Sequence, residues 1–127
     1  MNLALDTNAY SDFMRGVPEI KKSVWAAVKI YLPYVVLAEL RGAFLAGSKR
    51  QQNETMLDEF LKARKVCVLY PDEGTVQHYA ETYGELKSKG RMIPNNDLWV
   101  AAIVIQHRLT LCSRDSHFDH LPQIMRV

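Results

Sequence analysis

The sequence predicts an α/β fold, a three-layer α/β/α sandwich with a mostly parallel central sheet. Three observations lead to this prediction. An apolar run, Leu3-Ala4-Leu5, ends at Asp6, as expected of a parallel strand that is covered on both faces. Short strand-like runs alternate with longer segments of helical periodicity along the chain. The segment 98–105 is apolar around most of its circumference, which is typical of a helix buried between a sheet and its neighbours.

Length and composition are those of an ordinary globular protein. A chain of 127 residues fits one domain spanning residues 1–127, and its 48% hydrophobic and 24% charged residues are unexceptional. No apolar stretch approaches the roughly 20 residues that a membrane span needs, and the N-terminus lacks the pattern of a signal peptide. We therefore expect a cytoplasmic protein without a membrane partner.

The net charge of +2 is small, but its distribution matters. If several of the 14 acidic residues gathered in one pocket, the 16 Lys and Arg would leave the remaining surface clearly basic. Such a surface suits a polyanionic partner. The two cysteines, Cys67 and Cys112, lie in apolar segments and are expected to be buried strand residues rather than a disulfide pair.

Strands and helices are expected to alternate in order. The strands are predicted at Leu3–Leu5, Ile30–Leu32, Val66–Leu69, Thr110–Ser113 and, as an edge strand, Ile124–Val127. Helices are predicted at Tyr10–Met14, from Pro18 to about Val28, at Tyr34–Leu45, at Asn53–Arg64, after Asp72, and from Asn96-Asp97 onward, with loops at Gly47–Gln52 and Ser88–Asn95. The helix after Asp72 should turn its apolar face inward, namely Val76, Tyr79, Ala80, Tyr83 and Leu86.

Four carboxylates stand out from this pattern. Asp6 and Asp115 follow predicted strands, Asp97 begins a buried helix, and Glu39 lies within an apolar helix. Because the carboxyl ends of parallel strands are where α/β proteins bind ligands, these side chains are candidates for one site. Carboxylates brought together repel each other, and a hard divalent cation such as Mg²⁺ removes that conflict.

Structural explanations compete with the metal site. Asp6 and Asp97 could be N-caps of the helices that follow them, and Asp115 could be a turn residue that satisfies its own backbone. Glu39 could form an ion pair with Arg41 or Arg108. From the residues alone, the metal site and these structural roles both stay open.

A family resemblance favours the metal site. The segments Asp6-Thr7-Asn8, Ala38-Glu39-Leu40-Arg41-Gly42, Asn96-Asp97-Leu98-Trp99-Val100-Ala101-Ala102 and Ser113-Arg114-Asp115-Ser116-His117-Phe118 resemble the motifs of the PIN-domain nucleases. In detail they are similar to the VapC toxins of bacterial and archaeal toxin–antitoxin pairs. Each motif is short, but the four occur in the right order and span nearly the whole chain.

The resemblance implies an α/β/α fold around a parallel sheet and a hydrolase that cleaves RNA with Mg²⁺ or Mn²⁺. The family's four acidic residues correspond to Asp6, Glu39, Asp97 and Asp115, of which the three aspartates would hold one or two ions. Glu39 would bind metal or orient the attacking water. The supporting polar residues correspond to Thr7, Asn8 and Ser113; the family often has Thr in the last position.

The resemblance also implies partners. The family's toxins pair as homodimers and are bound by an antitoxin of the VapB type. The apolar excess in Tyr34–Leu45 and around Asn53–Leu61 is consistent with a surface that a partner covers. The leading alternative is a PIN-type nuclease of RNA processing or turnover without an antitoxin.

Three other classes fit less well. A phosphatase with an aspartyl nucleophile needs a second Asp two residues after the first, and residue 8 is Asn. A zinc site built from Cys112, His117 and His120 matches no closed structural spacing, so both histidines are expected to be surface turn residues. A non-catalytic interaction module, in which the acids merely cap helices, stays open.

Overall fold

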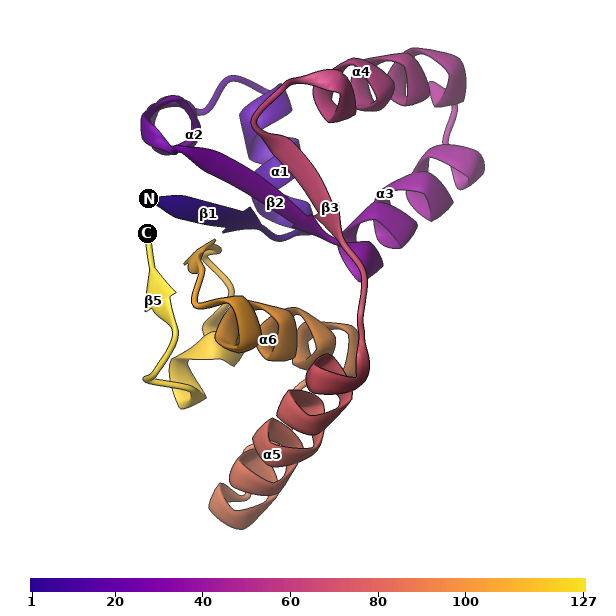
Figure 1. The fold of residues 1–127 in the computed structure, drawn as a ribbon. Helices are drawn as coiled ribbons and strands as arrows, with labels where there is room; N and C mark the ends of the chain where they lie inside the picture. Colours follow the sequence, from indigo (N-terminus) through magenta and orange to yellow (C-terminus); the bar gives the residue numbers. More distant parts are fainter.

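The central sheet has five parallel strands in the order β3-β2-β1-β4-β5 (Figure 1), in a computed structural model that describes residues 1–127. The strands are β1 (Asn2–Leu5), β2 (Lys29–Pro33), β3 (Val66–Leu69), β4 (Thr110–Cys112) and β5 (Met125–Arg126). Strand β1 pairs with β2 on one side and with β4 on the other, so the first strand of the chain is the centre of the sheet. The predicted parallel α/β/α architecture is confirmed.

Helices cover both faces of this sheet. They are α1 (Thr7–Met14), α2 (Pro18–Ala26), α3 (Tyr34–Ala46), α4 (Arg50–Lys62), α5 (Glu73–Lys89), α6 (Asn95–His107) and the short 3₁₀ helix η1 (Ser116–His120). Figure 1 shows α1, α2 and α4 on one side of the sheet and α5 and α6 on the other. None of these helices combines the length and the apolar character that crossing a lipid bilayer would require.

The hydrophobic core lies on both sides of β1. Leu3, Ala4 and Leu5 are fully buried, as a central strand covered on both faces requires. Helix α6 contributes a run of buried residues from Leu98 to Val104, and Phe118 of η1 is 1% exposed. The apolar character of α6 and the buried place of β1, both expected from the sequence, are therefore confirmed.

Several element bounds differ from the predicted ones. Helix α4 begins at Arg50 rather than Asn53, because residues 50–52 contain no Gly or Pro and the N–H of Asn53 donates to the carbonyl of Lys49. Helix α5 continues to Lys89 and ends at Gly90, whose φ of 66° supplies the left-handed cap. The predicted loop at Ser88–Asn95 is correspondingly shorter.

The predicted inner face of α5 is right for Leu86, which is fully buried, and for Tyr79, which is partly buried, but it is wrong for the other three residues, of which Ala80 is exposed. Val76 and Tyr83 are 56% and 41% exposed, whereas Thr75 and Thr82 are buried beside Leu86. These threonines can be buried because their hydroxyls are hydrogen-bonded, that of Thr82 to the carbonyl of His78 at 2.7 Å. Helix α5 therefore packs on α6 through small, satisfied polar side chains, which an apolar pattern does not reveal.

The two cysteines have different environments. Cys112 on β4 is buried, as predicted. Cys67 is exposed, which contradicts the prediction, because β3 is an edge strand whose side chains are covered only in part. Both thiols are free.

Leu57 and Met56 are neighbours on α4 with different surroundings, since Leu57 is fully buried and Met56 is 36% exposed. We expect Leu57→Ala to lower the free energy of unfolding by about 3 kcal/mol, because it removes buried methyl groups and leaves a cavity. Met56→Ala, the matched control, should cost about 1 kcal/mol or less. Urea unfolding followed by circular dichroism would measure both, and equal losses would contradict the packing described here.

Candidate active site

The ends of β1 and β4 meet at the point where the strand order reverses, because the chain leaves β1 toward β2 while β4 lies on the other side. This is the place where open parallel sheets bind ligands. A cleft of about 190 Å³ opens there. Its lining contains all four of the predicted acids and two of the predicted polar residues: Asp6, Thr7, Asn8, Val36, Glu39, Asp97, Val100 and Asp115.

Asp6 lies at the floor of this cleft and is 8% exposed. Its Oδ1 accepts a hydrogen bond of 2.8 Å from the N–H of Ala9, so the residue is the N-cap of α1. Burial raises the pKa of this carboxyl, and the negative charges of Asp115 and Asp97 raise it further. Asp6 is thus both a helix cap and a member of the acidic site.

Ser113 connects the first and last acids. Its hydroxyl is close enough to the Asp6 carboxylate to lower the pKa of Asp6, which opposes the rise that burial causes. The same hydroxyl oxygen accepts a hydrogen bond of 3.1 Å from the N–H of Asp115. Ser113 is buried and contacts the site from beneath, without lining the cleft. The hydroxyl expected at this position therefore has a structural partner on each side.

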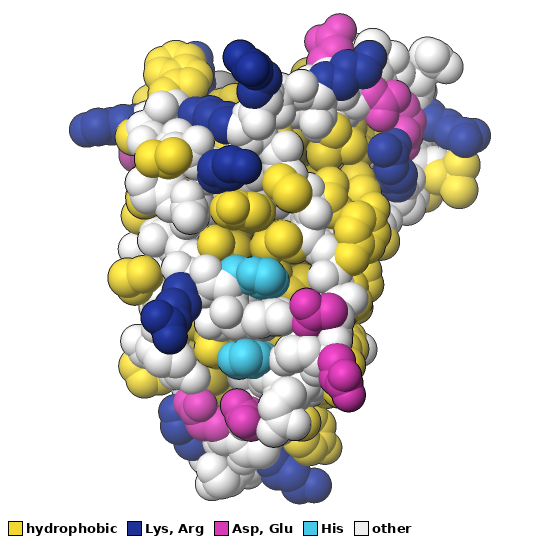
Figure 2. All heavy atoms as spheres, viewed as in Figure 1, with side chains coloured by type: hydrophobic (Ala, Val, Ile, Leu, Met, Phe, Trp, Pro, Cys, Tyr) yellow, Lys and Arg dark blue, Asp and Glu magenta, His cyan; other side chains and the backbone are white.

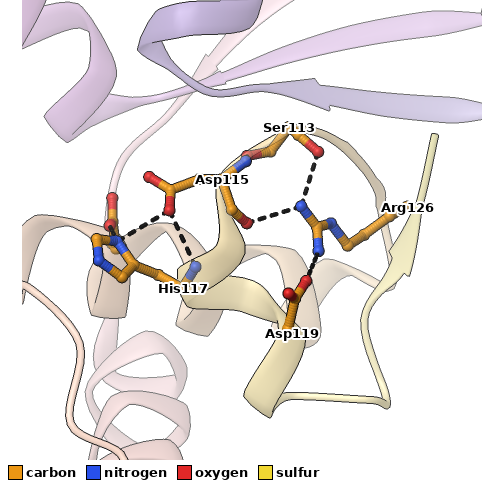
Figure 3. A network of polar contacts seen from close by, with 6 residues as sticks. Ser113, Asp115, His117, Asp119 and Arg126 are labelled. Carbon is orange, nitrogen blue, oxygen red and sulfur yellow. Dashed lines mark hydrogen bonds and ion pairs between the residues drawn. The ribbon is translucent and has the colours of Figure 1, made fainter.

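Asp97, Asp115 and His117 form a compact cluster. The Nδ1 atom of His117 lies 2.7 Å from Oδ2 of Asp97 and 3.0 Å from Oδ1 of Asp115. Asp115 also caps η1 by accepting from the N–H of His117 at 2.9 Å, and Figure 3 shows these two residues facing each other. Asp97 lies in the first turn of α6, which begins at Asn95, so it is not the N-cap.

The pKa of Asp97 is shifted by the same kinds of interaction as the pKa of Asp6. Burial raises the pKa of the Asp97 carboxyl, the hydrogen bond from His117 lowers it, and the charges of Asp115 and Glu39 raise it again. One ligand atom from each of Asp97, Asp115 and His117 falls within 4.8 Å of the other two. Two carboxylates and an imidazole set this closely are a donor set that a divalent cation fits.

Glu39 approaches the cleft from α3, and its side chain is exposed rather than buried in the helix. The Thr7 hydroxyl donates a hydrogen bond of 2.9 Å to its Oε1 atom. Arg41, one of the two arginines that could have neutralised it, pairs with Glu54 and Asp58 of α4 instead. The alternative in which Glu39 serves an ion pair with Arg41 is therefore wrong.

A further acid, Asp12 on α1, lies near the site and is not predicted from the sequence. Its side chain is 6% exposed, and its Oδ1 contacts the guanidinium groups of Arg15 at 2.5 Å and of Arg114 at 3.4 Å. Both arginine side chains are mostly exposed, at 63% and 71%. The charges of Asp6 and Asp12 help burial to raise the pKa of the Cys112 thiol to about 11, so this thiol is neutral.

His117 is the main residue of the cluster that the sequence did not assign to it. It was expected to be a surface turn residue, and its side chain is indeed 43% exposed, but its ring lies between two of the acids. His117 follows Asp115 by two residues, in a turn that folds back onto the end of β4. This position is the feature of the sequence that could have indicated its place between the acids. Asp12 follows Asp6 by six residues, a spacing that carries no comparable indication.

Comparisons with known proteins identify the family of this chain. The family model described as PIN domain matches residues 3–124. Ribonuclease VapC1 of Haemophilus influenzae (strain R2866) is 34% identical over 117 residues, covering 83% of this chain and 85% of that protein. Ribonuclease VapC2 of Rickettsia felis is 31% identical over 103 residues, covering 76% of this chain and 71% of that protein.

A solved structure shows the same fold. The crystal structure of VapBC2 from Rickettsia felis, bound to a DNA fragment from its promoter, contains a chain that superposes with a TM-score of 0.87 at 26% identity. The match covers 100% of this chain and 98% of that one. The chain therefore belongs to the PIN-domain family, and within it to the VapC ribonucleases.

Proposed function

We propose that this protein is a metal-dependent endoribonuclease and the toxin of a type II, VapBC-like toxin–antitoxin pair. The observation that carries the proposal is the meeting of Asp6, Glu39, Asp97 and Asp115, from four separate parts of the chain, in one cleft at the carboxyl edge of the sheet. Acids that only capped helices would have no reason to converge.

PIN-domain nucleases depend on a metal ion, and the residues present fit one. We assign Asp97 and Asp115 as its first ligands, with Asp6 facing the same space and His117 offering a nitrogen donor. Carboxylate oxygens suit Mg²⁺ and Mn²⁺ equally, whereas an imidazole adds preference for Mn²⁺. When bound there, the cation supplies an acidified water as nucleophile and neutralises charge on the departing oxygen of the phosphodiester.

The chain's own residues have separate tasks around this centre. Glu39, held by the Thr7 hydroxyl at the mouth of the cleft, orients the attacking water and accepts a proton from it. Asn8 lines the same space and offers an amide to the substrate. Arg114 and Arg15, which both pair with Oδ1 of Asp12 and have mostly exposed side chains, offer positive charge to the RNA phosphates.

Apolar surface remains for protein partners. A groove of about 230 Å³ lies between α1, α3 and α4, and its apolar lining consists of Tyr10, Met14, Phe44 and Met56. In Figure 2, apolar side chains gather over β3 and α3, with Lys and Arg side chains along the edge near α2 and α4. The related chains solved in VapBC complexes support an antitoxin as the occupant of this surface. A second copy of the chain is the further partner that the family resemblance implies.

We expect purified protein to cut a mixture of tRNA, rRNA and mRNA into discrete fragments with Mg²⁺ or Mn²⁺ and to stop in EDTA. Asp97→Asn should lower the rate at least about 100-fold, because it removes a metal ligand without changing side-chain size. Asp58→Asn, which removes an equal charge from exposed α4, is the matched control and should cut normally. Gel electrophoresis of the fragments measures all of these rates.

The opposite results separate the alternatives. Cutting that survives EDTA and the Asp97→Asn substitution would show a contaminant or a different chemistry. Absence of cutting together with absence of metal binding would favour the interaction module. Cleavage without an antitoxin gene beside the nuclease gene would favour an enzyme of RNA processing or turnover.

His117 is expected to be a metal ligand. His117→Gln should weaken Mn²⁺ binding by about tenfold or more and Mg²⁺ binding less, since Mg²⁺ gains little from an imidazole. His120→Gln is the matched control, because the side chain of His120 makes no contact with the acids. Isothermal titration with each metal decides the question, and unchanged Mn²⁺ affinity would exclude His117 as a ligand.

Asp6→Asn is expected to stabilise the metal-free protein at neutral pH. Burial raises the pKa of Asp6 above its ordinary value near 3.8, so its contribution to stability is present at low pH and is lost as the pH rises through the folded-state pKa. Asn keeps the cap on α1 and removes the charge. Thermal unfolding in EDTA should show a higher Tm for the variant at pH 7, with the difference shrinking toward pH 4.

Asp12→Asn provides the contrast. It removes the charge that pairs with Arg15 and Arg114, so it should lower the Tm under the same conditions. A lower Tm for Asp6→Asn as well would mean that the buried charge of Asp6 and its repulsion by the other carboxylates do not limit the stability of the metal-free protein.

A further inference from the structure

Arg126 joins the edge strand β5 to the loop that carries Asp115 and His117. One of its terminal nitrogens, Nη2, donates to the backbone carbonyls of Ser113 at 2.9 Å and of Asp115 at 2.7 Å. The other, Nη1, donates to Oδ1 of Asp119 at 2.6 Å. Figure 3 shows these bonds fanning out from a single guanidinium group across the loop.

The position of this guanidinium is fixed from several directions. The backbone of β5 pairs with β4, with Arg126 opposite Leu111. The Cζ atom lies 5.9 Å from the centre of the Phe118 ring, and the Arg126 side chain is 24% exposed. Its Nε is buried without a partner, so the terminal nitrogens carry all of the hydrogen bonding. A partly buried charge held by three polar contacts leaves little freedom to the groups that it contacts.

The accepting groups enclose the functional residues of the loop. The two carbonyls lie on either side of Arg114, and Asp119 lies two residues beyond His117. Ser113, whose carbonyl is held, also accepts a hydrogen bond of 3.1 Å from the N–H of Asp115 through its hydroxyl oxygen, and this hydroxyl lowers the pKa of Asp6. Fixing both ends of this turn therefore sets where Asp115, His117 and the Ser113 hydroxyl lie relative to Asp97 and Asp6.

We propose that Arg126 is a positioning residue of the active site, which holds the Ser113–Asp119 loop so that Asp115 and His117 present their ligand atoms beside Asp97. It touches neither the cleft nor the three donor atoms, so it acts through the loop alone. The planar fork of Arg fits this task because its donors diverge in one plane toward separate acceptors, which the single ammonium of Lys does not reproduce. The proposal rests on the proposed function in one respect, since it assigns the loop to a metal-dependent nuclease site.

The test compares four variants for RNA cleavage, Mn²⁺ affinity and hydrogen exchange of the His117 amide. In Arg126→Gln we expect kcat to fall about 10- to 100-fold with little change in KM, and Mn²⁺ affinity to fall about tenfold, as for other residues that orient metal ligands. The His117 amide, which donates to Asp115, should exchange faster. Arg126→Lys should recover part of each loss.

Two further variants serve as a milder change in the same network and as a control for the loss of charge. Asp119→Ala removes one of the three contacts from a residue whose side chain is 61% exposed, so it should fold normally and show smaller losses of the same kind. Arg64→Gln removes an equal charge from the exposed segment before β3 and should match the native protein in every measurement.

Native kcat, native Mn²⁺ affinity and native exchange at His117 in a folded Arg126→Gln protein would overturn the proposal. So would a fall in Tm without any change in these three quantities, since that would make Arg126 merely structural. If the native protein cut no RNA, the proposed function would fail, but the exchange rate of the His117 amide would still decide whether Arg126 holds the loop.

Discussion

The site depends on one constraint, which is that a parallel sheet brings the carboxyl ends of its strands to the same edge. Here that edge gathers Asp6 from the end of β1 and Asp115 from the end of β4, with Asp97 and Glu39 added from α6 and α3. Burial in the cleft disfavours the charged form of these carboxyls, and their like charges repel; burial first and repulsion second raise the pKa of Asp6 and of Asp97. The fold holds the acids together at a cost in stability, and a divalent cation relieves this cost.

Helix N-termini moderate the same repulsion. Asp6 caps α1, Asp115 caps η1 and Asp97 lies in the first turn of α6, so each aspartate lies where backbone N–H groups and the helix dipole favour a negative charge. The capping bonds of Asp6 and Asp115 each use Oδ1, which leaves the second oxygen of each carboxylate for another ligand. The structural and functional explanations of these acids are therefore compatible, because capping orients a carboxylate that the proposed metal site would use.

The sequence was sufficient to predict the order of the elements, the central place of the first strand and the parallel sheet, because buried strands and the apolar helix α6 have distinct patterns. The convergence of Asp6, Glu39, Asp97 and Asp115 also followed from the motifs, although their catalytic roles stay predictions. Packing between helices was harder to foresee, since α5 buries Thr75 and Thr82 through hydrogen bonds and exposes Val76 and Tyr83. His117, Asp12 and Arg126 were missed because their roles arise from the turns and tertiary contacts that bring them to the site.

Arg126 is an example of a tertiary contact that links an edge strand to the loop that carries Asp115 and His117. Strand β5 is short and lies at the edge of the sheet, where backbone pairing is available from one side only, so it would open easily by itself. Its bonds to the carbonyls of Ser113 and Asp115 work in both directions, because they hold the strand against β4 and they hold the loop beside Asp97. Local opening of β5 would therefore release the ligand-bearing loop at the same moment. A cation bound by Asp97 and Asp115 would in turn favour the closed state of this edge, so metal binding and the order of β5 are thermodynamically linked.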